Sequence, residues 1–121
     1  MTRFEFEQQR NLLRISYSGH VTLDEVRGMR PELDATLQSV PSGFRLLADL
    51  SGLDEMDVEC SSEIRLVMDD LRERGVAQIV RVIPDHWKDI GFAMMSRFHY
   101  NSSVSMQTVE TAEEAAHLLE L

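Results

Sequence analysis

The chain has few of the residues that form disulfides, bind metals or carry out catalysis in small proteins. It contains one cysteine, Cys60, which excludes an intrachain disulfide and gives no sign of a secreted scaffold. The four histidines follow no metal-ligand spacing, so no zinc site is predicted: His20, His86, His99 and His117. No nucleophile elbow, P-loop or dinucleotide-binding glycine pattern occurs, and no nucleophile–base pair is visible. We therefore expect neither an enzyme nor a cofactor.

Positive charge and long apolar runs are also scarce. The chain has 12 basic against 21 acidic residues and a formal charge of −9. This balance favours solubility and repels phosphate backbones, so we expect no nucleic-acid partner. No apolar run approaches the roughly 20 residues that span a bilayer, so we expect no integral membrane association. The first five residues lack an apolar signal core, which makes a cytoplasmic location the default expectation.

The residues that are present fit one globular domain. Hydrophobic residues make up 43% and charged residues 27% of the 121 positions, which suffices for one core. No repeat, low-complexity tract or linker divides the chain. We therefore predict a single domain over residues 1–121.

The first 40 residues predict a hairpin followed by helix. Two apolar/polar alternations, around Phe4 and around Ile15, are separated by a short polar run and predict two antiparallel strands. Thr22 and Glu25 then have the spacing of a capping box, followed by apolar residues at helical spacing. Pro31 interrupts that pattern, so we expect a kink near Arg30 or two short helices in tandem.

The middle of the chain predicts a buried strand, a polar turn and a long helix. Residues 45–50 are short and mostly apolar, as in a central strand covered on both faces. From Asp57 a helix is expected to run to Arg74, with Gly75 as its terminating glycine. One stripe of that helix is apolar: Cys60, Ile64, Val67, Met68 and Leu71.

The last third continues the alternation of strand and helix. Residues 76–83 predict a strand, and Asp85 is a candidate N-cap for a helix that carries Trp87. Residues 104–109 predict the last strand, and Thr111 with Glu114 opens a final helix. The fold predicted is α/β: a mixed, mainly parallel sheet of about five strands with an antiparallel N-terminal edge hairpin, flanked by four helices.

This order of elements resembles the STAS domains, and in particular the SpoIIAA-like group of stand-alone bacterial proteins. The similarity covers the whole chain and rests on the hairpin, on the strand ending near Asp49, on Met56-Asp57 and on residues 111–116. In the antagonist family, an aspartate and a kinase-phosphorylated serine open the helix after the third strand. The resemblance places Asp57 at the aspartate and Val58 at the serine. Valine has no oxygen to phosphorylate, so the usual kinase switch is not expected.

The resemblance implies a non-enzymatic interaction or regulatory module that binds a protein partner or a second copy of itself as a homodimer. The predicted contact surface is the turn after the third strand and the start of the next helix: Asp49, Ser51, Asp54, Asp57, Ser61 and Ser62. A further hypothesis is an anti-sigma factor antagonist phosphorylated at Ser61 or Ser62 instead of position 58. The simpler alternative is that these serines are N-caps or first-turn residues, and that Ser51 forms a turn.

Three other features each leave an alternative open. Phe92, Met95 and Phe98 belong to a group rich in methionine and aromatic residues, which predicts core packing or, alternatively, an interface or a pocket for an apolar or lipid-like ligand. Cys60 is interpreted as a buried small hydrophobe rather than a reactive thiol. The acids around Asp54 lack EF-hand spacing, so we predict a solvated turn without metal.

Overall fold

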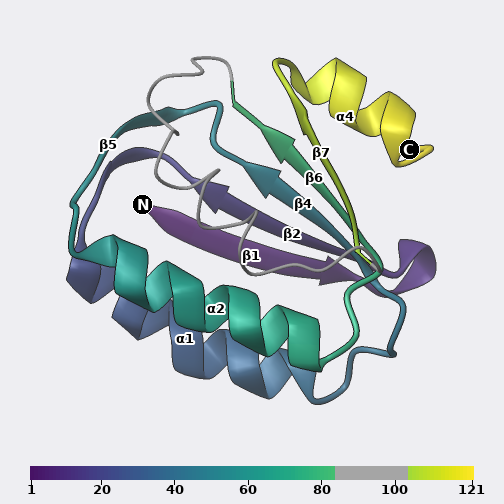
Figure 1. The fold of residues 1–121 in the computed structure, drawn as a ribbon, viewed down its shortest axis with the longest axis horizontal. Coiled ribbons are helices and arrows are strands. Elements are labelled where there is room, and N and C mark those ends of the chain that lie inside the picture. The colour runs from purple at the N-terminus through teal and green to yellow at the C-terminus, as the bar shows by residue number, and fades with distance from the viewer. Residues whose placement is uncertain (84–103) are drawn as a thin grey trace.

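The fold centres on a five-stranded sheet, seen in a computed structural model that describes residues 1–83 and 104–121 (Figure 1). The strand order is β1-β2-β4-β6-β7; β1 and β2 pair antiparallel, and every other neighbouring pair is parallel. The strands are β1 Thr2–Glu7, β2 Leu12–Tyr17, β4 Arg45–Asp49, β6 Gln78–Val82 and β7 Ser105–Val109. The predicted mixed sheet with an antiparallel edge hairpin is confirmed.

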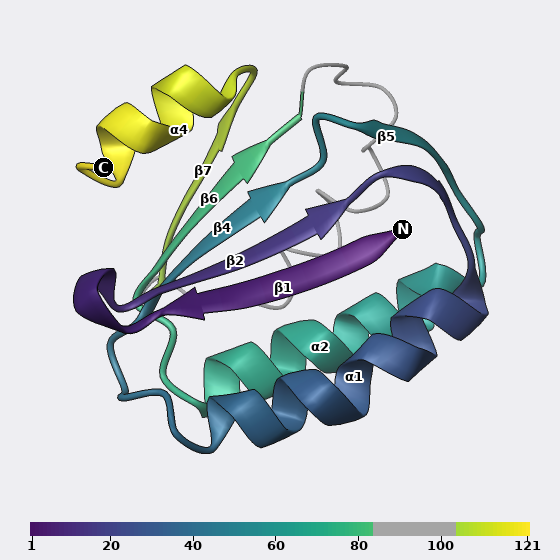
Figure 2. The same cartoon turned by 180° about the vertical axis from the view of Figure 1, so that it is seen from behind.

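Three α-helices cover the sheet within the described residues. They are α1 Leu23–Leu37, α2 Cys60–Glu73 and α4 Ala112–Leu118, and a short 3₁₀ helix, η1 Gln8–Arg10, joins β1 to β2. Figure 2 shows α1 and α2 on one face of the sheet and α4 on the other. The fourth expected helix, with Asp85 as its N-cap and Trp87 inside it, lies outside the described residues.

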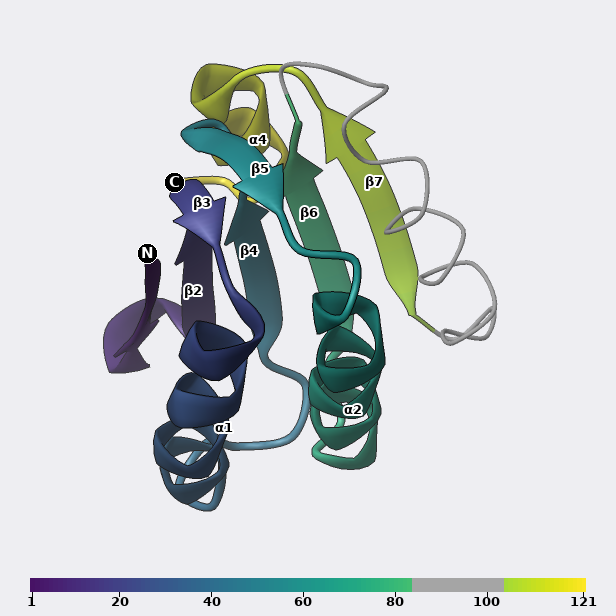
Figure 3. The ribbon, with the colours of Figure 1, turned by 90° about the vertical axis from the view of Figure 1, so that its left-hand side faces the viewer.

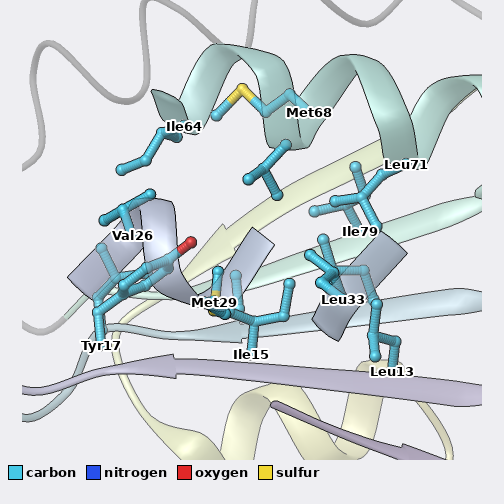
Figure 4. Packing of buried hydrophobic residues seen from close by; sticks show 14 of the residues in the cluster. Leu13, Ile15, Tyr17, Val26, Met29, Leu33, Ile64, Met68, Leu71 and Ile79 are labelled. Atoms are coloured by element: carbon cyan, nitrogen blue, oxygen red, sulfur yellow. The ribbon is translucent and has the colours of Figure 1, made fainter. Parts of the chain in front are cut away.

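The central strands are apolar because both of their faces are covered. Leu46 and Ala48 of β4 belong to the cluster under α1 and α2, whereas Leu47 packs on the α4 side. The larger cluster joins the sheet to both long helices (Figure 4). The smaller one consists of Leu12, Leu47, Val80, Val82, Ala115 and Leu119. Burial of each aliphatic side chain in these clusters stabilises the folded state by about 1.5–3 kcal/mol. Both faces of the sheet are therefore held to the helices that cover them.

Helix α1 begins at the predicted capping box and is continuous. The Glu25 N–H donates to Thr22 Oγ1 at 3.4 Å, and the Thr22 N–H donates to Glu25 Oε1 at 3.3 Å. Because the helix runs unbroken through Pro31, the alternative of two short helices is wrong. Pro31 is exposed, and the buried stripe lies on the other side of it: Val26, Met29, Leu33 and Leu37. Packing of that stripe offsets the roughly 3 kcal/mol that an interior proline costs.

Helix α2 ends at the predicted glycine. The Gly75 N–H donates to Arg72 O at 3.0 Å and the Val76 N–H donates to Leu71 O at 3.2 Å, which is the Schellman pattern. Gly75 has φ +87°, and a Cβ there would lie 2.2 Å from Ser42 Oγ. Only glycine fits this turn between α2 and β6 without a shift of Ser42.

A second, two-stranded sheet was not predicted. The segment interpreted as a polar turn contains β5, Leu53–Met56, which pairs parallel with β3, Gly19–Val21. The expected helix start at Asp57 is also wrong, because the Asp57 N–H donates to Val21 O at 3.0 Å and α2 begins at Cys60. Two acids in β5 hide its strand character, and its pairing partner lies more than 30 residues away in the sequence.

Replacing the helix proline tests this account of α1. We expect Pro31→Ala to raise the free energy of unfolding by about 1–3 kcal/mol, since alanine restores an N–H and removes the steric clash. Urea unfolding followed by circular dichroism measures the change. The exposed neighbour variant Glu32→Ala serves as control, with an expected change within about 0.5 kcal/mol. Equal or lower stability of Pro31→Ala would show that the proline is accommodated in another way.

Candidate functional site

The first part of the predicted surface is a tight turn at the end of β4. Asp49 Oδ1 accepts a hydrogen bond from the Ser51 N–H at 2.9 Å. The Gly19 N–H donates to Gly52 O at 2.8 Å, which ties the turn to the start of β3. Ser51 itself is exposed. The Asp49 side chain therefore stabilises the turn, and Ser51 takes the turn-forming role that was its simpler interpretation.

The second part is held by a pair between His20 in β3 and Asp57 after β5. His20 Nε2 and Asp57 Oδ1 lie 2.6 Å apart. This hydrogen bond and the charge of Asp57 raise the pKa of His20 above its ordinary value. Figure 3 shows β3 and β5 side by side, leading into the first turns of α1 and α2. The pair thus fixes the chain immediately before α2.

The entry to α2 exposes an apolar side chain. Val58 is 85% exposed, and Leu66, two helical turns further on, is 38% exposed. Ser61 and Ser62 are also exposed, and Ser62 Oγ donates to Glu59 O at 3.2 Å. The residue at the N-cap is Glu59, whose side chain makes no capping bond, so of the two simpler interpretations of Ser61 and Ser62 the first-turn position is confirmed and the N-cap is not. Both serines lie inside the first turn of the helix.

The predicted contact residues do not form one cluster around a single turn. Asp49 and Ser51 lie before β5, whereas Asp57, Ser61 and Ser62 lie after it, and Asp54 is exposed within it. A four-residue strand extends the chain by roughly 13 Å. The structure thus divides the predicted surface into a turn after β4 and the entry to α2.

Cys60 opens α2 with its side chain in the core. The residue is 0% exposed, and its Sγ lies 3.7 Å from Val21 O. Burial raises the pKa of the Cys60 thiol, and the charges of Asp57 and Glu59 raise it further. The interpretation as a buried small hydrophobe is confirmed, and a raised pKa disfavours the thiolate that a reactive cysteine needs.

Comparisons with known proteins find similarity in structure alone. No protein-family model and no curated protein matches the chain. An uncharacterized protein of the DUF3478 family from Shewanella loihica PV-4, described as having a SpoIIAA-like fold, matches with a TM-score of 0.71 and 15% identity, over 98% of this chain and 92% of that one. The anti-sigma factor antagonist SpoIIAA in its unphosphorylated form matches with a TM-score of 0.66 and 16% identity, over 99% and 98%. The phosphorylated Bacillus cell fate determinant SpoIIAA gives 0.64 and 17%, over 98% and 99%.

The chain has a SpoIIAA-like fold. The expected resemblance is therefore confirmed for the architecture, over nearly the whole length of each structure. The structural match establishes the fold. Because the identities are only 15–17%, it does not assign roles to individual residues, and these are argued from physical chemistry.

The SpoIIAA-like core holds one small cavity among the described residues. Its volume is about 30 Å³, and Tyr17, Met68 and Ile79 are among the side chains that line it. That space is of the order of one water molecule and is far too small for a lipid. The residues predicted for an apolar ligand, Phe92, Met95 and Phe98, lie outside the described residues, so the carrier hypothesis stays a prediction.

Neither a metal-binding cluster nor a membrane-spanning helix is found in the described part of the chain. Residues 1–83 and 104–121 contain no group of three or more His, Cys, Asp or Glu side chains that could hold a metal ion. Among these residues, no helix has both the length and the apolar character needed to cross a bilayer.

The pair between His20 and Asp57 predicts a pH dependence. Since folding raises the pKa of His20 above 6.5, its stabilising contribution is complete below about pH 6.5 and is lost as the pH rises through the folded-state value. We expect an NMR titration to give a His20 pKa above 6.5, and Asp57→Asn to lower it. Asp54→Asn, an exposed change in the neighbouring strand, is the control and leaves that pKa in place. An identical His20 pKa in wild type and Asp57→Asn would contradict the pairing.

Proposed function

We propose that the chain is a non-enzymatic regulatory module that binds another protein through the α2 entry surface, defined as Asp57, Val58, Ser61, Ser62 and Leu66. The observation that carries the proposal is the 85% exposure of Val58 at the start of a helix whose other face is fully packed. A large apolar side chain gains free energy when a partner covers it. Leu66, inside α2, is the second partly exposed apolar side chain of this surface, at 38%.

The charges around Val58 indicate the chemistry of the partner. Three acids, Glu55, Asp57 and Glu59, lie within three residues of Val58, and the whole chain carries a formal charge of −9. A partner that presents a small apolar pocket rimmed by basic side chains complements this surface. The fold supports a role in binding, because one of the similar structures is of SpoIIAA described as an anti-sigma factor antagonist.

The proposed contact is permanent rather than switched by phosphate. The resemblance to the antagonist family places Val58 at the position of the phosphorylated serine, and valine cannot be modified there. Phosphate on Ser61 or Ser62 would add negative charge beside Asp57, Glu59 and Glu63. Two amides that would favour an anion at this helix end are already used, since the Cys60 and Ser61 N–H groups donate to Asp57 O and Val58 O.

A charge placed at Val58 tests the binding surface. We expect Val58→Arg to fold like wild type, because the side chain is exposed, and to lose at least tenfold of its partner affinity through repulsion by a basic partner. Proteins retained by each purified variant from the encoding organism are quantified by mass spectrometry. Leu121→Arg is the matched control, since it converts another exposed apolar residue to the same charge. Equal retention by Val58→Arg and wild type would remove the α2 entry surface from consideration.

The intact mass of protein purified from its own organism tests the absence of a phosphate switch. We expect no covalent increment of one phosphate group at any growth stage, since position 58 has no hydroxyl. An increment that disappears in the Ser61→Ala/Ser62→Ala variant would overturn this and support the antagonist hypothesis. The same native spectrum reports a bound small molecule, which would support the carrier hypothesis.

A further inference from the structure

The outer edge of β1 has no paired strand among the described residues. Within residues 1–83 and 104–121, β1 pairs only with β2, and it lies at one end of the sheet in Figure 2. The strand has six residues and contains neither proline nor glycine, and its register with β2 is regular. Natural edge strands are usually protected from pairing by charged side chains, proline or a bulge. β1 has no proline and no bulge, and its charged side chains are of both signs, so they can pair across an antiparallel contact.

The hydrogen-bond pattern shows which residues face the open edge. The Met1 amine donates to Ser18 O at 2.6 Å, and the Ser18 N–H donates to Met1 O at 2.9 Å. Residues bonded to the neighbouring strand alternate along an antiparallel pair. With the observed register, the odd-numbered residues of β1 form backbone hydrogen bonds to β2. The N–H and C=O groups of Thr2, Phe4 and Phe6 therefore point away from β2, in the plane of the sheet, toward its open edge.

Two side chains of β1, Arg3 and Glu5, carry opposite charges, and the one side-chain hydrogen bond that either makes among the described residues is from Arg3 Nε to Met1 Sδ at 3.1 Å. Arg3 and Glu5 are exposed on the face away from α1, and neither makes an ion pair within the described residues. Phe4 points to the other face and packs against the main core cluster. An open groove of about 640 Å³ follows this edge, and Phe4, Gly28 and Met29 are among its lining residues. A Cβ placed on Gly28 would meet no atom within 4 Å, so the groove is open beside Phe4.

We propose that β1 of one copy pairs antiparallel with β1 of a second copy, with Phe4 at the two-fold axis. This register places Arg3 opposite the partner's Glu5, and Glu5 opposite the partner's Arg3. Phe4 lies opposite the partner's Phe4, whose ring extends the apolar part of the groove. The outward N–H and C=O groups of Phe4 bond to those of the partner's Phe4, and the two sheets become one.

Charge selects this register from the others that the backbone permits. Only the outward-facing Thr2, Phe4 and Phe6 bond across the edge, so the strands slide in steps that keep even-numbered residues opposite one another. The next register in one direction places Arg3 opposite the partner's Arg3. The next in the other direction places Glu5 opposite the partner's Glu5. Opposed like charges destabilise a cross-strand pair, whereas opposite charges stabilise it.

A charge exchange tests the dimer without disturbing the core. Sedimentation velocity of wild type over a range of concentrations is expected to show a monomer–dimer equilibrium. Arg3→Glu places two pairs of like charges across the interface, and we expect the dissociation constant to rise about tenfold or more. Arg3→Glu/Glu5→Arg exchanges the charges and restores the pairing, so the dissociation constant returns toward wild type. Both positions are exposed, so circular dichroism is expected to show unchanged folding.

Amide hydrogen exchange supplies an independent readout. We expect exchange at Phe4 and Phe6 to slow as the protein concentration rises, whereas Arg3 and Glu5 are already protected through β2 and stay unchanged. A wild type that is monomeric up to about 1 mM would overturn the proposal and leave the edge to a strand of another protein. A dimer with the same dissociation constant in Arg3→Glu, or with Phe4 exchange independent of concentration, would also overturn it.

Discussion

The parallel pairing of β2, β4 and β6 determines most of this structure, because it creates two apolar faces that must both be covered. Leu46 and Ile79 require the layer formed by α1 and α2, whereas Leu47 and Val80 require α4. Because β2 and β4 are parallel, their carboxyl ends lie at the same end of the sheet. The short β3–β5 sheet continues from those two ends and leads into α1 and α2.

The surface proposed for binding depends on that small sheet. Pairing of β5 with β3 directs the chain away from β4, and the contact between His20 and Asp57 holds it in place before α2 begins. Cys60 then points into the core, which leaves Val58 pointing to solvent. An exposed valine stands there in an acidic setting, and we propose that this surface binds without a phosphate switch. The edge of β1, unpaired among the described residues, shares no residue with the α2 entry surface, so each proposal is tested independently.

The sequence predicted those elements whose signal lies within one segment. Helix α2 was recognised because its apolar stripe repeats within 12 residues, and α1 and α4 because Thr22 and Thr111 each precede a glutamate at capping-box spacing. The β3–β5 sheet was missed because three- and four-residue strands carry little periodicity and their pairing joins distant segments. For the same reason, no local pattern links His20 to Asp57, and the strand β5 between the two groups of predicted contact residues has no signal in the sequence.

Direct contact between Val58 and a protein partner is the proposal on which the binding surface depends. A photo-activated cross-linking residue at position 58, expressed in the encoding organism, measures that contact, with position 113 on α4 as the exposed control. We expect a discrete cross-linked protein at position 58 that is absent at position 113. Adducts that are equal at the two positions, or that form only at position 113, would contradict the proposal.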